Sequence, residues 1–411
     1  MITNHKFLFR WIFIYFFLYE FPSFLSYIEP ISIINDAING FYHNLVPWFG
    51  KEVLLLEQDI NVVSNGSGDR TYNYIQVLIW FISSFAGACI WTLIGDKKWD
   101  YQKLNYWLLV WVRFTLGIFL IQYGMIKVVN LQFPDPGFYR LTQTIGEMSP
   151  MGLAWTFLGY SKGYNWFIGL GEIIGGALLL HRRTTLLGAM ISFVVVINIV
   201  AINMFFDVPV KLFSSHLLMM SILIMSPHIK KLFQIIFDIS NLFVHKMNWK
   251  IKEIPMPQIG KWVLLGFVIY PILSGVSERN KRGVASNPMN GIYEVQLYQN
   301  KSDSLLPATD PVEEWNKIVL YDNVIQAINR NRTRSYFKID KDSINQTMRI
   351  SDYYDSTKVS QLHYQYADSV LTLTGKYPEV SVFIEAKQGD KEDFLLLKRG
   401  FRWINEVPFN R

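Results

Sequence analysis

Three side chains able to carry acid–base chemistry stand inside stretches that are otherwise apolar: Tyr123, Lys127 and His216. Tyr123 and Lys127 are four residues apart, so a helix through them places the phenol and the ammonium group on one face. His216 is expected at a comparable depth in another segment. Together these groups can donate hydrogen bonds or protons to the head group of a membrane-soluble molecule. They are the candidate catalytic set.

Polar residues near the ends of the neighbouring segments are expected to surround this set. The candidate binding residues are Gln132, Asn198, Asn203, Asp207 and Lys211. Pro134 and Pro136 stiffen the loop that follows Gln132. The alternative is an ordinary hydrated rim around one internally hydrogen-bonded histidine, and the sequence leaves both interpretations open.

Arg113 and Glu172 also fall inside apolar segments, where ionisable groups are costly unless they are paired or hydrated. At the rise of an α-helix, both are expected about 12 Å from the same end of consecutive segments. Gly171 and Gly175 flank the carboxylate and would let a partner helix come close. We therefore predict a structural, buried Arg113–Glu172 ion pair.

Metal and haem chemistry are not indicated. The chain has seven histidines, of which His216 alone lies well inside an apolar stretch, so a bis-histidine haem has no second ligand. The single cysteine, Cys89, cannot form an intramolecular disulfide. We predict no metal site and no cofactor held by this chain.

The composition is that of a membrane protein. The 411 residues are 51% hydrophobic and 18% charged, and several nearly uncharged runs approach the length of about 20 residues that crosses a bilayer. The net charge of +6 is carried at segment ends, as expected for positive flanks of membrane spans, so no nucleic-acid partner is predicted.

About seven spans are predicted. They cover residues 7–27, 74–94, 106–129, 164–180, 185–206, 212–225 and 261–276. The first resembles a signal peptide, but Glu20 stands where a small-residue cleavage site is required, so it is predicted to remain as a span. Residues 229–246 combine an apolar stripe with charges and are predicted to lie in the interface; a spanning arrangement is the alternative.

Lysine and arginine concentrate in alternate loops, which indicates the orientation. The basic set comprises the N-terminus, residues 96–103, residues 181–183 and residues 230–252. The positive-inside rule places these in the cytoplasm. Seven spans from a cytoplasmic N-terminus then place the C-terminal region outside the cytoplasm.

After residue 276 the long apolar segments give way to short runs in which apolar and polar residues alternate. The predicted strands cover residues 293–299, 317–322, 335–340, 369–375, 379–387 and 394–398. This pattern is typical of a soluble all-β domain, either an antiparallel sandwich or a small barrel. The predicted fold class is therefore an α-helical polytopic membrane bundle followed by that domain.

One region resembles the DoxX family of bacterial membrane proteins. The resemblance rests on Tyr123-Gly124-xx-Lys127, on the block from Gly171-Glu172 to the Arg182-Arg183 stop, and on the glycine-bearing helix that follows. It covers roughly residues 113–227 and implies a four-helix membrane core in the bacterial inner membrane. Some relatives are quinone-linked, as in the DoxD subunit of thiosulfate:quinone oxidoreductase. The resemblance thus implies a quinone and a redox partner protein.

The domain prediction combines these observations. It comprises N-terminal spans over 1–104, the DoxX-like core over 105–227, an interfacial helix and last span over 228–276, and the β-rich domain over 277–411. Two functions stay open. One is a quinone- or lipid-head-group-binding component of an oxidoreductase system, and the other is a membrane scaffold whose external domain recruits an envelope partner or ligand.

Overall fold

The computed structural model describes residues 5–26, 32–95, 99–237, 266, 287–301, 314–355, 357, 359–377 and 381–398. The chain falls into two compact units. The membrane unit consists of Met1–Asp135 and Met148–Val276, and the barrel unit of Pro136–Glu147 and Ser277–Arg411. The boundary after Val276 coincides with the predicted change from apolar segments to short alternating runs. Nothing in the sequence predicts that Pro136–Glu147 belongs with the second unit.

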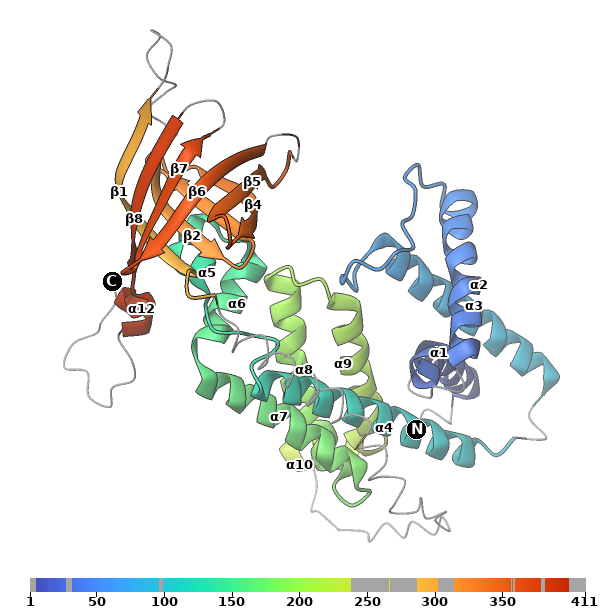
Figure 1. Ribbon diagram of the computed structural model, residues 1–411. Helices are drawn as coiled ribbons and strands as arrows, with labels where there is room; N and C mark the ends of the chain where they lie inside the picture. The colour runs from blue at the N-terminus through green and yellow to red at the C-terminus, as the bar shows by residue number, and fades with distance from the viewer. Residues whose placement is uncertain are drawn as a thin grey trace. The chain divides into compact units, whose positions relative to one another are not determined.

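The described part of the membrane unit is helical (Figure 1). Its elements are α1 Lys6–Ser26, α2 Ser32–Trp48, the π-helix η3 Phe49–Val53, α3 Thr71–Ile94, α4 Tyr101–Val128, α6 Pro150–Tyr160, α7 Lys162–Leu180, α8 Thr185–Phe205, α9 Lys211–Met225, η5 Ser226–His228 and α10 Ile229–Phe237. Four of these helices, α3, α4, α7 and α8, are long and apolar enough to cross a bilayer. These four helices support the prediction that the chain is a membrane protein.

The seven predicted spans are found only in part. α9 has 15 residues, so it is about 22 Å long and shorter than the hydrocarbon core. α1 forms a helix of 21 residues but is not among the four. The span predicted over 261–276 lies outside the described residues, apart from residue 266. α10 covers the first part of the predicted interfacial helix, and the remainder also lies outside them.

The region between the first two predicted spans contains a helix, α2, that the sequence analysis did not predict. α2 packs against α3 around Val46, Tyr72 and Ile75, which are all buried. Asp69, in the loop between η3 and α3, attaches this loop to the start of α9. Its carboxylate accepts hydrogen bonds from the backbone N–H groups of Lys211 (2.7 Å) and Leu212 (3.0 Å). Asp69 therefore caps the N-terminus of α9.

The β region is a closed, eight-stranded antiparallel barrel (Figure 1). Its strands are β1 Gly291–Lys301, β2 Trp315–Tyr321, β3 Val324–Asn329, β4 Arg334–Asp342, β5 Thr347–Asp352, β6 Val359–Ala367, β7 Val370–Lys376 and β8 Ser381–Gly389. Each strand pairs with its neighbour in sequence, and β8 returns to pair with β1, for example at Tyr298 opposite Ile384. Of the two open alternatives, the barrel is correct.

The predicted strand over 394–398 is wrong. In the structure, Phe394 is the C-cap of the 3-10 helix η7 Lys391–Asp393, and the other four residues form the short helix α12 Leu395–Lys398. The run contains three consecutive leucines and no alternation, and β8 has already closed the barrel on β1, so no free edge remains for another strand.

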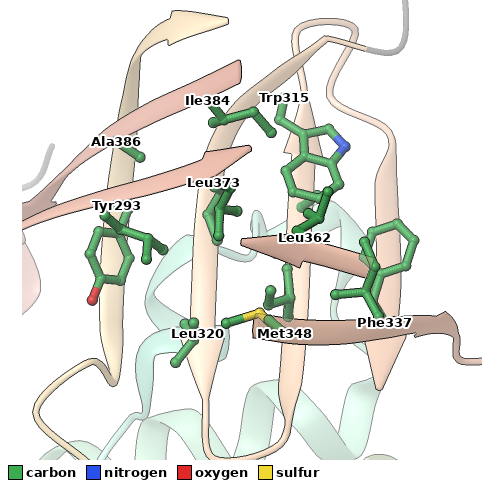
Figure 2. Packing of buried hydrophobic residues seen from close by; sticks show 14 of the residues in the cluster. Tyr293, Trp315, Leu320, Phe337, Met348, Leu362, Leu373, Ile384 and Ala386 are labelled. Atoms are coloured by element: carbon green, nitrogen blue, oxygen red, sulfur yellow. The ribbon is translucent and has the colours of Figure 1, made fainter. Parts of the chain in front are cut away.

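Side chains fill the barrel interior. Alternate residues of each strand point inward, as in the pairs Phe337 and Ile339 or Leu371 and Leu373. Figure 2 shows large side chains, among them Tyr293, Trp315, Met348 and Leu362, meeting in one core. Eight strands enclose a space just wide enough for such a core. A tight turn with positive φ at Asp368 and Ser369 joins β6 to β7, as a hairpin with a two-residue loop requires.

Pro136–Glu147, which joins α4 to α6 in sequence, packs within the barrel unit. It contains α5 Phe138–Thr142 and η4 Ile145–Glu147. The guanidinium group of Arg334 donates hydrogen bonds to the carbonyl oxygen of Thr142 (2.8 Å) and to Oε2 of Glu147 (2.7 Å). This hydrogen bond holds the pKa of Glu147 low, at about 2. One arginine thus attaches the middle and the C-terminal end of the segment.

Candidate functional site

An ion pair joins α4 to α7 inside the membrane unit. Nζ of Lys127 lies 2.7 Å from Oε1 and 2.8 Å from Oε2 of Glu172. The two residues are 4% and 1% exposed, respectively. Removing two charges from water is costly, and a pair is tolerated only when its geometry is close and its hydrogen bonds are made. Both carboxylate oxygens share the ammonium group, so the geometry meets this condition.

Glycines bring the two helices close enough for this pair. A Cβ atom on Gly124 would lie 2.5 Å from the carbonyl oxygen of Gly169, and one on Gly169 would lie 2.7 Å from that of Gly124. Gly117 and Gly176 meet in the same reciprocal manner, at 3.0 and 2.6 Å. No larger residue fits at these contacts without moving a backbone, which is how small residues permit close packing of membrane helices.

These are not the glycines that the sequence analysis singled out. Gly175 faces α8, where a Cβ atom would lie 3.0 Å from Oγ of Ser192, and Gly171 would make only an ordinary contact of 3.6 Å with Val195. The spacing of small residues correctly predicted that a helix packs closely against α7. It did not identify the glycines, Gly169 and Gly176, that make the closest contacts with α4.

The predicted Arg113–Glu172 pair is corrected by the structure. Glu172 pairs with Lys127, while Nη1 of Arg113 donates to Oγ1 of Thr185 at 3.1 Å. Because α4 and α7 are antiparallel with Gly117 beside Gly176, Arg113 lies about eight residues, or about 12 Å, along the axis from the level of Glu172.

The direction of the side chains adds to this difference. Helical side chains lean toward the N-terminus of their own helix. In the antiparallel pair, Lys127 and Glu172 therefore lean toward each other, and Arg113 leans away from Glu172. The ion pair follows from register and direction together, and depth alone is not sufficient to predict it.

His216 lies in a second buried arrangement, between α9 and α1. Its Nδ1 is 2.7 Å from the carbonyl oxygen of Leu212, which can only accept, so Nδ1 carries the proton. Nε2 then accepts a hydrogen bond of 2.6 Å from the hydroxyl of Tyr15. The ring of Tyr19 stacks on the imidazole with 3.9 Å between centroids and 3° between planes. We call Tyr15, Tyr19 and His216 the tyrosine–histidine cluster.

The cluster continues into α3 and α2. Trp80 of α3 meets the ring of Tyr19 edge-on at 5.7 Å, and its indole Nε1 donates to the hydroxyl of Tyr42 at 2.9 Å. Tyr123 lies near enough to Tyr19 for their hydroxyl groups to interact electrostatically. The cluster is therefore a set of polar aromatic groups contributed by several helices.

The predicted catalytic set is thus divided between two arrangements. His216 belongs to the tyrosine–histidine cluster and Tyr123 lies beside it, in contact with Phe213 at 5.7 Å between ring centroids. The ammonium group of Lys127 lies 5.8 Å from the ring of Tyr123, but its hydrogen bond goes to Glu172. Lys127 holds helices together in this structure.

The structure places the predicted binding residues in different surroundings. Asp207 and Lys211 form an ion pair of 2.7 Å at the turn before α9. Asn203 is buried, Gln132 is half-buried, and Asn198 is exposed on the surface of α8. Among the described residues, no group of three or more histidine, cysteine, aspartate or glutamate side chains is arranged to hold a metal ion.

A comparison with curated proteins finds one relative. The chain is 40% identical over 115 residues to the uncharacterized protein YwoB of Bacillus subtilis (strain 168). The match covers 28% of this chain and 71% of YwoB. Over this part, the chain belongs to the YwoB family. No family model matches the chain, and no solved structure matches it.

Membership of the YwoB family assigns no activity, so the site has to be read from its geometry. The residues that the sequence analysis missed, Tyr15 and Tyr19, lie on α1, which was predicted as an uncleaved membrane span. Their spacing of four residues, which places both hydroxyl groups on one helix face, was the available signal. Glu20 is the next residue along α1.

Proposed function

We propose that the chain is an integral protein of the bacterial inner membrane that binds the head group of a quinone or a lipid, as a component of an oxidoreductase system. The observation that carries this proposal is the tyrosine–histidine cluster. It places a phenol and an imidazole in one hydrogen-bonded chain, Tyr15 to His216 to Leu212, among apolar helices. Polar groups in such surroundings are costly, and membrane proteins generally place them at functional sites.

The chemistry of the cluster suits a head group. A phenol can redirect its hydrogen bond from an imidazole to the carbonyl oxygen of a ligand, and the stacked rings of Tyr19 and His216 offer a flat surface to a flat ring. The resemblance to the DoxX family supports the same ligand class, because some DoxX relatives are quinone-linked. In this proposal the electrons come from a partner protein, the N-terminus is cytoplasmic and the barrel is extracytoplasmic.

The test is to extract the purified protein with organic solvent and to quantify bound quinone by chromatography. Tyr15→Phe removes one hydroxyl and keeps the ring. A hydrogen bond with a net worth of about 1 kcal/mol corresponds to roughly fivefold in affinity, so we expect about that decrease in retained quinone. Tyr164→Phe, at an exposed position on α7, is the matched control. Wild-type protein that carries no quinone, and takes none up when it is added, would contradict the proposal.

A membrane scaffold that recruits an envelope partner is the second candidate, and the barrel favours it. Side chains fill the interior, so a partner would bind to the outer surface. Tyr321, the last residue of β2, and Ile344, in the β4–β5 connection, are 60% and 93% exposed, and both lie at the same end of the barrel. A protein that co-purifies with the wild type and is lost from Tyr321→Ser/Ile344→Ser would support this function, and equal recovery would count against it.

A further inference from the structure

Two carboxyl groups are buried in the described part of the membrane unit, and their surroundings are opposite. Glu172 is 1% exposed and Glu20 is 2% exposed. Glu172 is paired with the ammonium group of Lys127. Neither oxygen of Glu20 has a hydrogen-bond partner among the described residues. Glu20 is therefore the unsatisfied member of the two.

The groups that face Glu20 do not neutralise it. Thr115 and Trp111 of α4 are turned toward its carboxyl group, and the neighbouring titratable group is the hydroxyl of Tyr19. Among the described residues, no lysine, arginine or histidine forms an ion pair with it. An isolated carboxylate ion in apolar surroundings is far more costly than the neutral acid. The surroundings thus favour the protonated form.

A neutral carboxylic acid carries one O–H donor, and this donor needs an acceptor. Among the described residues, the hydroxyl of Thr115 faces the acid and could accept, but it makes no hydrogen bond of normal distance and angle with Glu20. Glu20 directly follows Tyr19, whose ring stacks on His216, so the acid lies next to the tyrosine–histidine cluster. A ligand held at the cluster by its head group would bring a carbonyl oxygen into this neighbourhood.

We infer that Glu20 is held as the neutral acid and is the hydrogen-bond donor for a carbonyl oxygen of a membrane-soluble ligand. Carbonyl oxygens of this kind belong to quinones and to ester-linked lipids. The ligand class rests on the proposed function, whereas the protonation state of Glu20 rests on its burial and its lack of a partner. The experiment separates these two parts.

The test is labelling with dicyclohexylcarbodiimide, an apolar reagent. A protonated carboxyl group transfers its proton to a carbodiimide nitrogen, its oxygen bonds to the carbodiimide carbon, and the adduct rearranges to a stable acylurea with no leaving group. The full-length protein is labelled at neutral pH in nanodiscs of ether-linked lipids, which lack the ester carbonyl. Mass spectrometry of the peptides then gives the labelled fractions of Glu20 and Glu172 in the same sample. Glu20→Gln verifies the assignment of the labelled peptide.

We expect Glu20 to be labelled at least about tenfold more than Glu172, which is held as a carboxylate by Lys127. A short-chain benzoquinone added to the ether-lipid nanodiscs should lower the labelling of Glu20, because the acid is then engaged. Protection in ester-linked lipids without quinone would identify a lipid carbonyl as the acceptor. This result would uphold the inference and count against the quinone form of the proposed function.

Two outcomes would overturn the inference. Labelling of Glu20 no stronger than that of Glu172 would show that Glu20 is not held as the acid. Strong labelling that neither the quinone nor the ester lipid reduces would show that it is not a donor to a ligand carbonyl. Since the labelling compares two residues of the wild-type protein, neither outcome depends on a variant that has to fold.

Discussion

The membrane unit and the barrel unit both bury apolar side chains, but among the described residues only the membrane unit also buries charged side chains and a histidine. The barrel core consists almost wholly of apolar residues such as Tyr293, Phe337 and Leu362. The buried residues of the membrane unit include Lys127, Glu172, Glu20 and His216. Meanwhile large apolar side chains cover the outside of the membrane helices.

The difference follows from the solvent that each unit meets. A barrel in water gains free energy by burying apolar surface. Helices in a bilayer gain little from this, because lipid chains are as apolar as leucine, and they associate through close packing and internal hydrogen bonds. A buried polar group is thus an exception in the barrel and an informative feature in the membrane unit. This is why both proposals concern the membrane unit.

The largest expected effect comes from breaking the Lys127–Glu172 pair. Lys127→Met leaves Glu172 buried without a counter-charge, and we expect a loss of about 3–5 kcal/mol in the free energy of unfolding. Thermal unfolding of the purified protein in detergent measures it. Lys127→Met/Glu172→Gln removes both charges and should recover part of the loss.

Lys211→Met is the matched control for this variant. Lys211 also pairs with an aspartate, but its side chain is 22% exposed, so we expect a loss of at most about 1 kcal/mol. If Lys127→Met and Lys211→Met unfold alike, the buried pair is not what holds α4 to α7.

A smaller effect, confined to the barrel, is expected from Leu362→Ala. Leu362 is fully buried in the barrel core, and shortening such a side chain leaves a cavity that costs about 3 kcal/mol. Hydrogen exchange should rise in β5, β6 and β7 and stay unchanged in α4 and α7. Tyr321→Ala, at an exposed position, is the control. Equal loosening of the membrane helices would mean that the two units do not have separate cores.

The sequence predicted the barrel better than the site, for physical reasons. Period-two alternation directly reports which side chains face a core, so runs such as residues 335–340 and 379–387 identified their strands. β3, β5 and β6 were missed. β6 begins with an outward Val359 and an inward Ser360, which weakens the pattern at its start.

The contacts of the membrane unit depend on register between distant segments. Hydropathy located α3, α4, α7 and α8, but it does not state which face of α7 meets α4. The Lys127–Glu172 pair is decided by the reciprocal glycine contacts. Asp69 bonds to backbone groups at Lys211 and Leu212, a contact across 142 residues that no local pattern contains. The tyrosine–histidine cluster likewise requires α1 to lie against α9.

The smallest expected effect concerns the attachment of Pro136–Glu147 to the barrel. Arg334 binds Glu147 at 2.7 Å, and this hydrogen bond lowers the pKa of Glu147 from its ordinary 4.5 to about 2. A carboxyl group whose pKa is lower in the folded state stabilises that state when it is ionised. The stabilisation is therefore complete above pH 4.5, decreases as the pH falls below this value, and is lost near pH 2.

Hydrogen exchange of residues 136–147, corrected for the intrinsic rate at each pH, measures this attachment. Arg334→Gln should reduce protection of the segment above pH 4.5, and the difference from the wild type should shrink as the pH approaches 2, leaving the part that is due to the carbonyl oxygen of Thr142. Glu294→Gln is the control, because Glu294 pairs with Lys317 on the exposed barrel surface and should leave the segment unchanged. We expect the effect to be modest because Glu147 is solvent-exposed and screened. A difference that persisted unchanged at pH 2 would mean that Arg334 holds the segment through the carbonyl oxygen of Thr142 alone.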